Sequence, residues 1–397
     1  MAVNPIIPPT LLQKLPYPSF IITTMLEYKE MLVAIFCFIF LLHWRRNRNS
    51  LFTDWPILRM LPSLLYNLPN IHDHVTQTLK KNGGTGQFIA PWFTQSSAVL
   101  TCDAMNVLHI TSTNFRNYDK GPEFREIFEV LGNGVLTDSK EWKYSRELLH
   151  SLFKKRNFHM FLDKIVQKKV ESCLFPFLDH VEKKRMEVDL QDVFNRFTFD
   201  NICCMVLGFD PNCLSIDLPL VVYEKFFGEA QVALFYRMVV PRSLWKLQKW
   251  LGIGKERKMS EARKVSELLF NEFIRCKRKQ QDKSGDGVEE ADFELLSEIM
   301  MMEEEKKGQM DDKLIRDNVL NILSAGKDTL TAGLSWFFWL VAAHPSVEAK
   351  ILEELKENFP TKEEKRMVLG KKEVEKLVYL HATICEAMRL FPQYLSR

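Results

Sequence analysis

The sequence lacks the cysteine and histidine spacings that mark a small metal-binding or redox domain. None of its eight cysteines forms a Cys-x-x-Cys pair, and no His-x-x-x-His accompanies them, so a structural zinc site is not expected. The cysteines are scattered among apolar neighbours, a distribution typical of reduced, buried thiols in a protein that faces the cytosol. They are Cys37, Cys102, Cys173, Cys203, Cys204, Cys213, Cys276 and Cys385.

The sequence also lacks an excess of charge of either sign, an internal repeat and a clean linker. Its 54 lysines and arginines oppose 51 aspartates and glutamates, a formal net charge of +3, which gives no reason to expect nucleic-acid binding. Short basic runs such as 154–156 and 276–279 are typical of solvated faces. Because 46% of the 397 residues are hydrophobic, the chain has ample material for a large core, and we expect one large domain.

Long apolar runs are absent apart from one near the N-terminus. Residues 31–42 (MLVAIFCFIFLL) precede Trp44 and the basic residues Arg45, Arg46 and Arg48. Twelve helical residues span roughly 18 Å, less than the ~30 Å hydrocarbon core of a bilayer. The positive cluster nevertheless follows the apolar run, which argues against a cleaved signal peptide. We expect a single anchor with the following domain in the cytosol; a helix lying in the membrane interface is the alternative.

This run divides the region ahead of the main domain into three expected segments. Residues 1–30 form a proline-rich leader that should be extended and poorly ordered. Residues 31–44 form the membrane anchor, and residues 45–65 form a basic hinge stiffened by prolines. Residues 66–397 then form the main domain.

Beyond the hinge, the sequence predicts a mainly helical domain with small β-sheets. Two short strands with a polar turn between them are expected at 87–93 and 97–101. From residue 103 onward the apolar periodicity is helical. Helices are predicted at 138–153, 158–184, 190–207, 222–251, 256–279 and 293–306, with a charged surface loop at 282–290 and a helix end at Gly308.

The most informative prediction is a long helix from Asp312 to Ala343, which would measure roughly 48 Å. Acidic residues begin it, no proline interrupts it, and Pro345 follows it. Its second half, 334–343, is apolar almost all round. A helix without a polar face is expected to be buried on every side, so this one should run through the centre of the fold.

In the middle of that helix, Ala325-Gly326-Lys327-Asp328-Thr329 departs from what simple packing requires. Gly326 costs up to about 1 kcal/mol relative to alanine in a helix interior, and Thr329 can bond to a carbonyl one turn earlier. A small residue, a carboxylate and a hydroxyl together permit an opening at a ligand face and a relay of protons. Spacing alone leaves a second interpretation, a tolerated kink with Asp328 facing solvent.

This segment and two further motifs resemble the cytochrome P450 family. The segment, on its long central helix, resembles the oxygen-activating motif of that family. Trp142-x-x-x-Arg146 resembles the motif that grips a heme propionate, and its i,i+4 spacing places both side chains on one helix face. Glu386-x-x-Arg389 resembles the family's ExxR pair. Each motif is weak alone, but three in order carry a resemblance that covers residues 55–392.

The resemblance implies a heme-dependent monooxygenase with the cytochrome P450 fold and heme b as its cofactor. Electrons would come from a membrane-bound NADPH–cytochrome P450 reductase, which carries the flavins, at the endoplasmic reticulum membrane. Substrate would meet the loop at 117–124 and the region near 226–236. The residues carried over are catalytic Asp328 and Thr329, cofactor-binding Trp142, Arg146, Ala325 and Gly326, and the structural pair Glu386 and Arg389.

The stretches 53–65, 236–258 and 334–340 are most similar to the plant branch that hydroxylates long-chain alkanes and fatty acids. The family's ligand motif, Phe-x-x-Gly-x-Arg-x-Cys, surrounds none of the eight cysteines, so we expect the iron's cysteine ligand to lie beyond Arg397. The thiolate promotes O–O cleavage, and the chain as written is therefore expected to be truncated and not to carry out monooxygenation. The alternative is a non-catalytic, membrane-tethered helical protein with a regulatory or interaction role.

Overall fold

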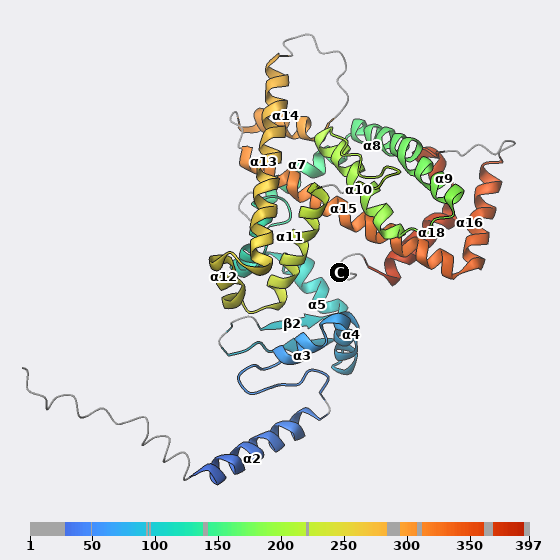
Figure 1. Cartoon of the computed structure of the whole chain (residues 1–397). Helices are drawn as coiled ribbons and strands as arrows, with labels where there is room; N and C mark the ends of the chain where they lie inside the picture. The colour runs from blue at the N-terminus through green and yellow to red at the C-terminus, as the bar shows by residue number, and fades with distance from the viewer. Residues whose placement is uncertain are drawn as a thin grey trace, which may run out of the picture. The chain divides into compact units, whose positions relative to one another are not determined.

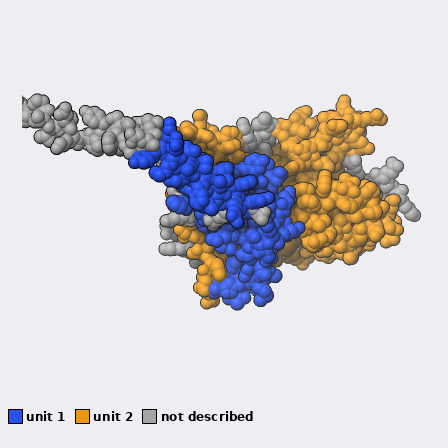
Figure 2. Space-filling view, turned by 90° about the horizontal axis from the view of Figure 1, so that it is seen from below, with its two compact units in different colours: residues 1–114 blue, residues 115–397 orange. Residues whose placement is uncertain are grey.

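The computed structural model describes residues 28–48, 50–92, 94, 97–137, 142–219, 222–283, 294–307, 312–360 and 368–392. The chain divides into two compact units, Met1–Asn114 and Phe115–Arg397, which Figure 2 shows in different colours. The described residues are mainly helical with one small sheet, which confirms the predicted fold class at that level. Most of the predicted leader, residues 1–27, lies outside the described residues.

The first unit contains an antiparallel pair of strands. In this pair Thr85 lies opposite Thr101 and Phe88 opposite Ala98, and the two threonine hydroxyls lie 2.9 Å apart. The predicted pair of strands is present, but the first runs from Thr85 to Phe88 and not over 87–93. It ends ahead of Pro91, which has no N–H to donate to a ladder. The elements of this unit include α2 (Lys29–Asn47), α3 (Leu61–Tyr66), α4 (Ile71–Lys81), β1 (Thr85–Phe88), β2 (Ala98–Thr101) and α5 (Ala104–Leu108).

Helix α2 contains the apolar run for which an anchor was predicted. Its side chains are largely exposed, with Phe36 at 70% and Phe38 at 62%. Among the described residues, no helix is long and apolar enough to cross a bilayer.

The second unit is built almost entirely of helices, and α15 crosses its middle (Figure 1). Its helices of six or more residues are α6 (Gly121–Ile127), α7 (Trp142–Phe153), α8 (Arg156–Lys169), α9 (Phe175–Lys184), α10 (Leu190–Leu207), α11 (Val222–Val239), α12 (Arg242–Leu251), α13 (Gly254–Lys283), α14 (Leu295–Lys307), α15 (Asp312–Ala343), α16 (Pro345–Asn358) and α18 (Val378–Leu390). Its shorter helices include η4 (Glu129–Leu131) and α17 (Lys371–Val374).

Helix α15 has the bounds that the sequence predicts, but the prediction that 334–343 is buried on every side is wrong. The buried stretch lies in the other half, between Leu314 and Leu323. Phe338 and Trp339 are 44% and 58% exposed. One side of the apolar half packs against the α18 end, where Trp336 stacks on Phe391 at 3.9 Å between ring centroids. Aromatic composition therefore indicated packing on one side, not burial all round.

Two predicted helices are interrupted by local chemistry. The helix predicted at 222–251 divides into α11 and α12 at Pro241, whose ring and missing N–H end a helical ladder. The helix predicted at 158–184 contains a π-turn at Val170–Leu174 between α8 and α9, just before Pro176. Most of the predicted loop at 282–290 and the predicted helix end at Gly308 lie outside the described residues.

The cysteines are all free, as predicted, but burial was predicted for too many of them. Cys203 and Cys213 are buried. Four of the remaining thiols are exposed, because they lie on outward faces of helices or just after a strand: Cys37, Cys102, Cys276 and Cys385. Cys385, expected to be packed, lies on the exposed side of α18.

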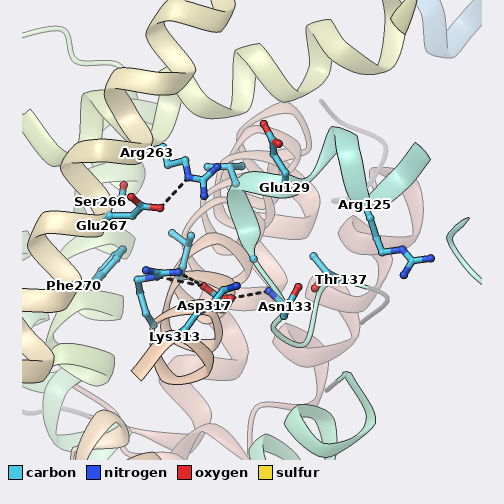
Figure 3. Close-up of a pocket in the computed structure, with 14 residues that line it drawn as sticks. Arg125, Glu129, Asn133, Thr137, Arg263, Ser266, Glu267, Phe270, Lys313 and Asp317 are labelled. Atoms are coloured by element: carbon cyan, nitrogen blue, oxygen red, sulfur yellow. Dashed lines mark hydrogen bonds and ion pairs between the residues drawn. The ribbon is translucent and has the colours of Figure 1, made fainter. Parts of the chain in front are cut away.

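Polar side chains of α15 hold the loop that precedes α7. The Asn133 N–H donates to Asp317 Oδ2 at 2.8 Å, as Figure 3 shows. The Leu136 N–H donates to Asn321 Oδ1 at 2.6 Å, and Asn321 Nδ2 donates to the Leu131 carbonyl at 2.7 Å. Asp317 and Asn321 are almost fully buried, and buried polar groups are costly unless they are paired. The loop and the helix therefore stabilise each other.

Gly132 is the residue that permits this approach, and replacing it tests the arrangement. Its φ is +65°, and a Cβ there would lie 2.1 Å from Asp317 Cγ. We expect Gly132→Ala to lower the free energy of unfolding by more than about 2 kcal/mol. Gly252→Ala is the matched control, since Gly252 has φ +64° and nothing within 4 Å of its Cβ position. Urea unfolding followed by circular dichroism gives the comparison; equal losses would contradict it.

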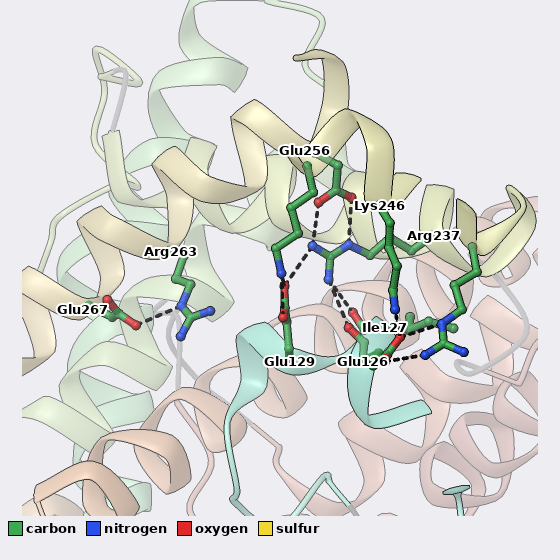
Figure 4. Close-up of polar contacts among 10 residues, drawn as sticks. Glu126, Ile127, Glu129, Arg237, Lys246, Glu256, Arg263 and Glu267 are labelled. Carbon is green, nitrogen blue, oxygen red and sulfur yellow. Dashed lines mark hydrogen bonds and ion pairs between the residues drawn. The ribbon is translucent and has the colours of Figure 1, made fainter. Parts of the chain in front are cut away.

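A buried arginine joins the 126–129 turn to α11 and α13 (Figure 4). Arg237 donates to both oxygens of Glu256, at 2.8 and 2.6 Å, and to Glu129 at 3.1 Å. It also donates to the carbonyls of Glu126 and Ile127. Burial opposes the charge, but the hydrogen bonds that Arg237 donates to Glu256 and the nearby negative carboxylates outweigh this effect and raise the pKa of Arg237. The guanidinium therefore stays charged inside the fold.

Removing this arginine leaves a buried carboxylate without its partner. We expect Arg237→Met to destabilise the fold by about 3–5 kcal/mol, because Glu256 is only 2% exposed. The double variant Arg237→Met/Glu256→Met should recover much of that loss. Arg242→Met, which breaks an exposed pair with Glu126, should have a far smaller effect. Chemical unfolding of the four proteins checks this, and similar losses for the two single arginine variants would refute it.

Candidate active site

Helices α7, α8, α10 and α15, together with the loop before α7, line a cavity of about 740 Å³. Three of the helices contribute stripes of side chains four residues apart, the spacing that places successive residues on one helix face. The stripes are Phe158, Leu162 and Val166 on α8, Phe197, Asn201 and Met205 on α10, and Ile322, Gly326, Leu330 and Leu334 on α15. The walls are therefore mainly aliphatic and aromatic, as expected of a site for an apolar ligand.

Four of the residues selected from the sequence lie together in this cavity. They are Arg146, Ala325, Gly326 and Thr329. The Thr329 hydroxyl donates to the Ala325 carbonyl at 2.6 Å, which confirms the predicted bond to the preceding turn. The helix remains continuous there, so this bond is made without a break in α15.

A glycine is required at position 326 by the neighbouring helix α10 as well as by the cavity. A Cβ at this position would lie 2.5 Å from Cδ1 and 3.2 Å from Cγ1 of Ile202 on α10. The glycine thus lets α10 and α15 approach closely where both line the cavity. The sequence indicated a small residue at a ligand face but not the partner that requires it.

Trp142 and Arg146 lie on one face of α7, as their spacing predicts. The guanidinium carbon of Arg146 lies 5.7 Å from the ring centre of Trp142, within range of a cation–π contact. The Trp142 ring also lies 6.2 Å from the ring of Phe115. Arg146 lines the cavity, whereas Trp142 is not among the lining residues.

Asp328 occupies a different face of α15 from Thr329. Its side chain is 5% exposed and does not line the cavity. Its Oδ1 lies 3.8 Å from Nζ of Lys327, which is also buried and lies 5.6 Å from the ring centre of Phe199 on α10. The solvent-facing interpretation of Asp328 is therefore wrong, because its side chain is buried.

The Glu386–Arg389 pair forms on α18, apart from the cavity. Arg389 donates to both carboxylate oxygens of Glu386, at 2.7 and 2.6 Å. Both side chains are more than half exposed. The bond from Arg389 lowers the pKa of Glu386. Glu386 also lines a second cavity, of about 350 Å³, between α15, α16 and α18.

The cavity also contains residues that motif reasoning missed. His150 follows Arg146 by one turn of α7 and lines the same space; its i+8 spacing from Trp142 was a usable signal. Asn201 lines the cavity from α10, and its side-chain Nδ2 donates to the Phe197 carbonyl at 2.7 Å. No sequence motif indicated this residue. None of the eight cysteines lines the cavity.

The packing of Gly326 against Ile202 gives a test of how the cavity is built. Gly326→Ala gains up to about 1 kcal/mol of helix propensity, but the added methyl must displace Ile202. We expect a net loss of about 1–2 kcal/mol. Ile202→Val removes Cδ1, the nearer of the two atoms, and should largely restore stability in the double variant. Thermal and urea unfolding measure both, and a Gly326→Ala protein more stable than the wild type would overturn this account of the contact.

Comparison with known proteins places the whole arrangement in one family. The cytochrome P450 family model matches residues 51–396. The alkane hydroxylase MAH1 of Arabidopsis thaliana is 38% identical over 91% of this chain and 71% of its own length. Cytochrome P450 86B1 of the same plant is 35% identical over 91% of this chain and 66% of its own length. A crystal structure of a cytochrome P450 (CYP102L1) shares the fold, with a TM-score of 0.65 and 20% identity over 85% of this chain and 69% of that one. The chain therefore belongs to the cytochrome P450 family and is, by that membership, a cytochrome P450 monooxygenase.

Proposed function

We propose that this protein hydroxylates long-chain aliphatic compounds, such as alkanes or fatty acids. The observation that carries the proposal is the cavity, whose walls are stripes of aliphatic and aromatic side chains with Thr329 and Arg146 among them. The relative named alkane hydroxylase supports the same substrate class. Sequence identity alone does not decide it, because a noroxomaritidine synthase of Narcissus is 34% identical.

The residues of the cavity fit most of what a heme requires. Apolar walls suit the faces of a porphyrin, and the Arg146 guanidinium suits a propionate, since its planar fork matches a carboxylate. Trp142 would fix the orientation of Arg146. When bound, the heme supplies the oxygen chemistry. An axial thiolate is the missing part of the fit, because no cysteine of this sequence lines the cavity.

Within this proposal, Thr329 and Asp328 act from two faces of α15. The Thr329 hydroxyl faces the cavity and can hold a proton or a water beside the reacting atoms. Asp328 is buried beside Lys327, so it acts on the cavity through its neighbours. Glu386 and Arg389 have a structural role on α18.

The setting of the reaction follows the family. We propose heme b as cofactor, an NADPH–cytochrome P450 reductase with its flavins as electron donor, and the endoplasmic reticulum membrane as location. The exposed apolar side chains of α2, followed by Arg45 and Arg48, support attachment to a lipid bilayer through residues 31–44. Residues 45–65 then serve as a hinge to the cytochrome P450 domain.

A second candidate is a non-catalytic, membrane-tethered protein that keeps the fold for interaction or regulation. The exposed apolar side chains of α2, with Phe36 at 70% and Phe38 at 62%, are the observation that supports a tether. Product formation separates the two. Loaded with heme and supplied with reductase and NADPH, a hydroxylase yields alcohols from alkanes or fatty acids, whereas the second candidate yields none.

The substrate class can be tested without any cofactor, by displacement of a fluorescent apolar probe from the cavity. We expect the affinity for n-alkanes and fatty acids to rise on the order of two- to fourfold per methylene, from about eight to about sixteen carbons. Ala325→Phe fills the cavity and should abolish this binding. Ala382→Phe, which fills the separate cavity near α18, is the matched control and should not. Affinity independent of chain length would refute the aliphatic assignment.

A further inference from the structure

A smaller pocket, of about 200 Å³, lies between α6 with the loop that follows it, α13 and the first half of α15 (Figure 3). Whereas the apolar cavity has aliphatic and aromatic walls, this pocket is lined mainly by charged and polar side chains. Four cations line it from segments far apart in the sequence: Arg125 on α6, Arg263 on α13, and Lys313 and Arg316 on α15. The fold therefore gathers positive charge at one place, although the formal net charge of the chain is only +3.

Three carboxylates also line the pocket, and the protein itself already engages them. Asp317 accepts the Asn133 N–H at 2.8 Å, and its Oδ1 lies 3.0 Å from Nη2 of Arg316. Glu129 accepts from Lys249 at 2.6 and 2.8 Å, and Lys249 is not part of the wall. The wall thus contains four cations and three carboxylates, and a cation from outside it offsets one of these carboxylates.

The third carboxylate, Glu267, pairs with Arg263 within α13. Arg263 Nε donates to Glu267 at 2.9 Å, and the two side chains are 47% and 38% exposed. A guanidinium has five N–H donors, so this bond leaves other Arg263 donors available to a ligand. Lys313 lies in the first turn of α15, where the positive end of the helix dipole adds to its charge. An anion can therefore meet several cationic donors in one small space.

We propose that this pocket binds a small phosphate-bearing anion, held by Arg263, Arg316 and Lys313. Phosphate suits the site better than a single carboxylate, because its oxygens accept from several donors at once and its second charge matches more than one cation. The donors are partly exposed and screened by salt, so we expect a dissociation constant on the order of 1 mM. The pocket and the apolar cavity share no lining residue, and the site does not depend on the proposed function.

The test is isothermal titration of the full chain with inorganic phosphate, at an ionic strength held constant with sodium chloride. Arg263→Met should weaken binding on the order of fivefold or more. Arg257→Met is the matched control, since Arg257 lies on the same helix and makes the same kind of pair, from Nε to Glu261 at 2.9 Å, but does not line the pocket. It should leave the dissociation constant unchanged. Circular dichroism confirms that each variant is folded.

Removing a carboxylate from the wall gives the opposite expectation, which a loss of folding cannot mimic. Glu267→Gln removes one negative charge and releases Arg263, so phosphate should bind on the order of two- to fivefold more tightly. Glu261→Gln, the same change beside Arg257, should have no effect. Weaker binding by Glu267→Gln, equal effects of Arg263→Met and Arg257→Met, or no saturable binding of phosphate would each overturn the proposal.

Two further ligands distinguish the source of the phosphate. Glycerol 3-phosphate carries the phosphate and glycerol of a lipid headgroup. If it binds more tightly than inorganic phosphate, the site is one for a headgroup; if it binds equally or more weakly, the site is one for free phosphate, and both results support the pocket as a phosphate site. Acetate binding as tightly as phosphate would refute the choice of phosphate over a carboxylate.

Discussion

The arrangement of the cavity depends on one constraint: α15 carries polar side chains through the core, where a polar group without a partner is costly. Asp317 and Asn321 bond to the backbone of the loop before α7, and Asn318 donates to the Ser145 hydroxyl on α7 at 3.1 Å. Because an unpaired buried group costs about as much as several apolar contacts gain, these bonds fix the rotation of α15 about its axis. That rotation turns Thr329 toward the cavity, which α7 also lines.

The same rotation distributes the central motif over two faces of the helix. Residues one apart on an α-helix point about 100° apart, so Thr329 faces the cavity while Asp328 is buried on another face of α15. The rotation of α15 therefore determines both that the Thr329 hydroxyl faces the cavity and that the Asp328 carboxylate is buried. Gly326 lets α10 approach α15 closely at Ile202.

Long elements with clear ends could be predicted from the sequence, and contacts between elements could not. Both α10 and α15 begin and end at the predicted residues, since Asp189 caps the first with its side chain and Pro345 follows the second. The cavity-lining residues Arg146, Ala325, Gly326 and Thr329 were also recognisable, because motifs preserve spacing. The exposure of Phe338 and Trp339, the burial of Asp328 and the part played by α10 depend on which helix lies opposite, and spacing within one helix does not contain that information.

Fold and reaction chemistry are therefore determined at different levels in this protein. The cavity has its shape because α15 is held by its polar contacts, α10 packs closely against it and α7 completes the wall. This shape does not depend on which atom coordinates an iron. The chemistry depends on that atom, since a thiolate promotes O–O cleavage and an imidazole serves the globins and peroxidases. Arg146 on α7 and Thr329 on α15 both line this cavity, so the packing of these two helices decides which polar groups a bound ligand meets. Because Asn318 of α15 donates to the Ser145 hydroxyl of α7, the bond that joins the two helices also sets the relative positions of those two polar groups.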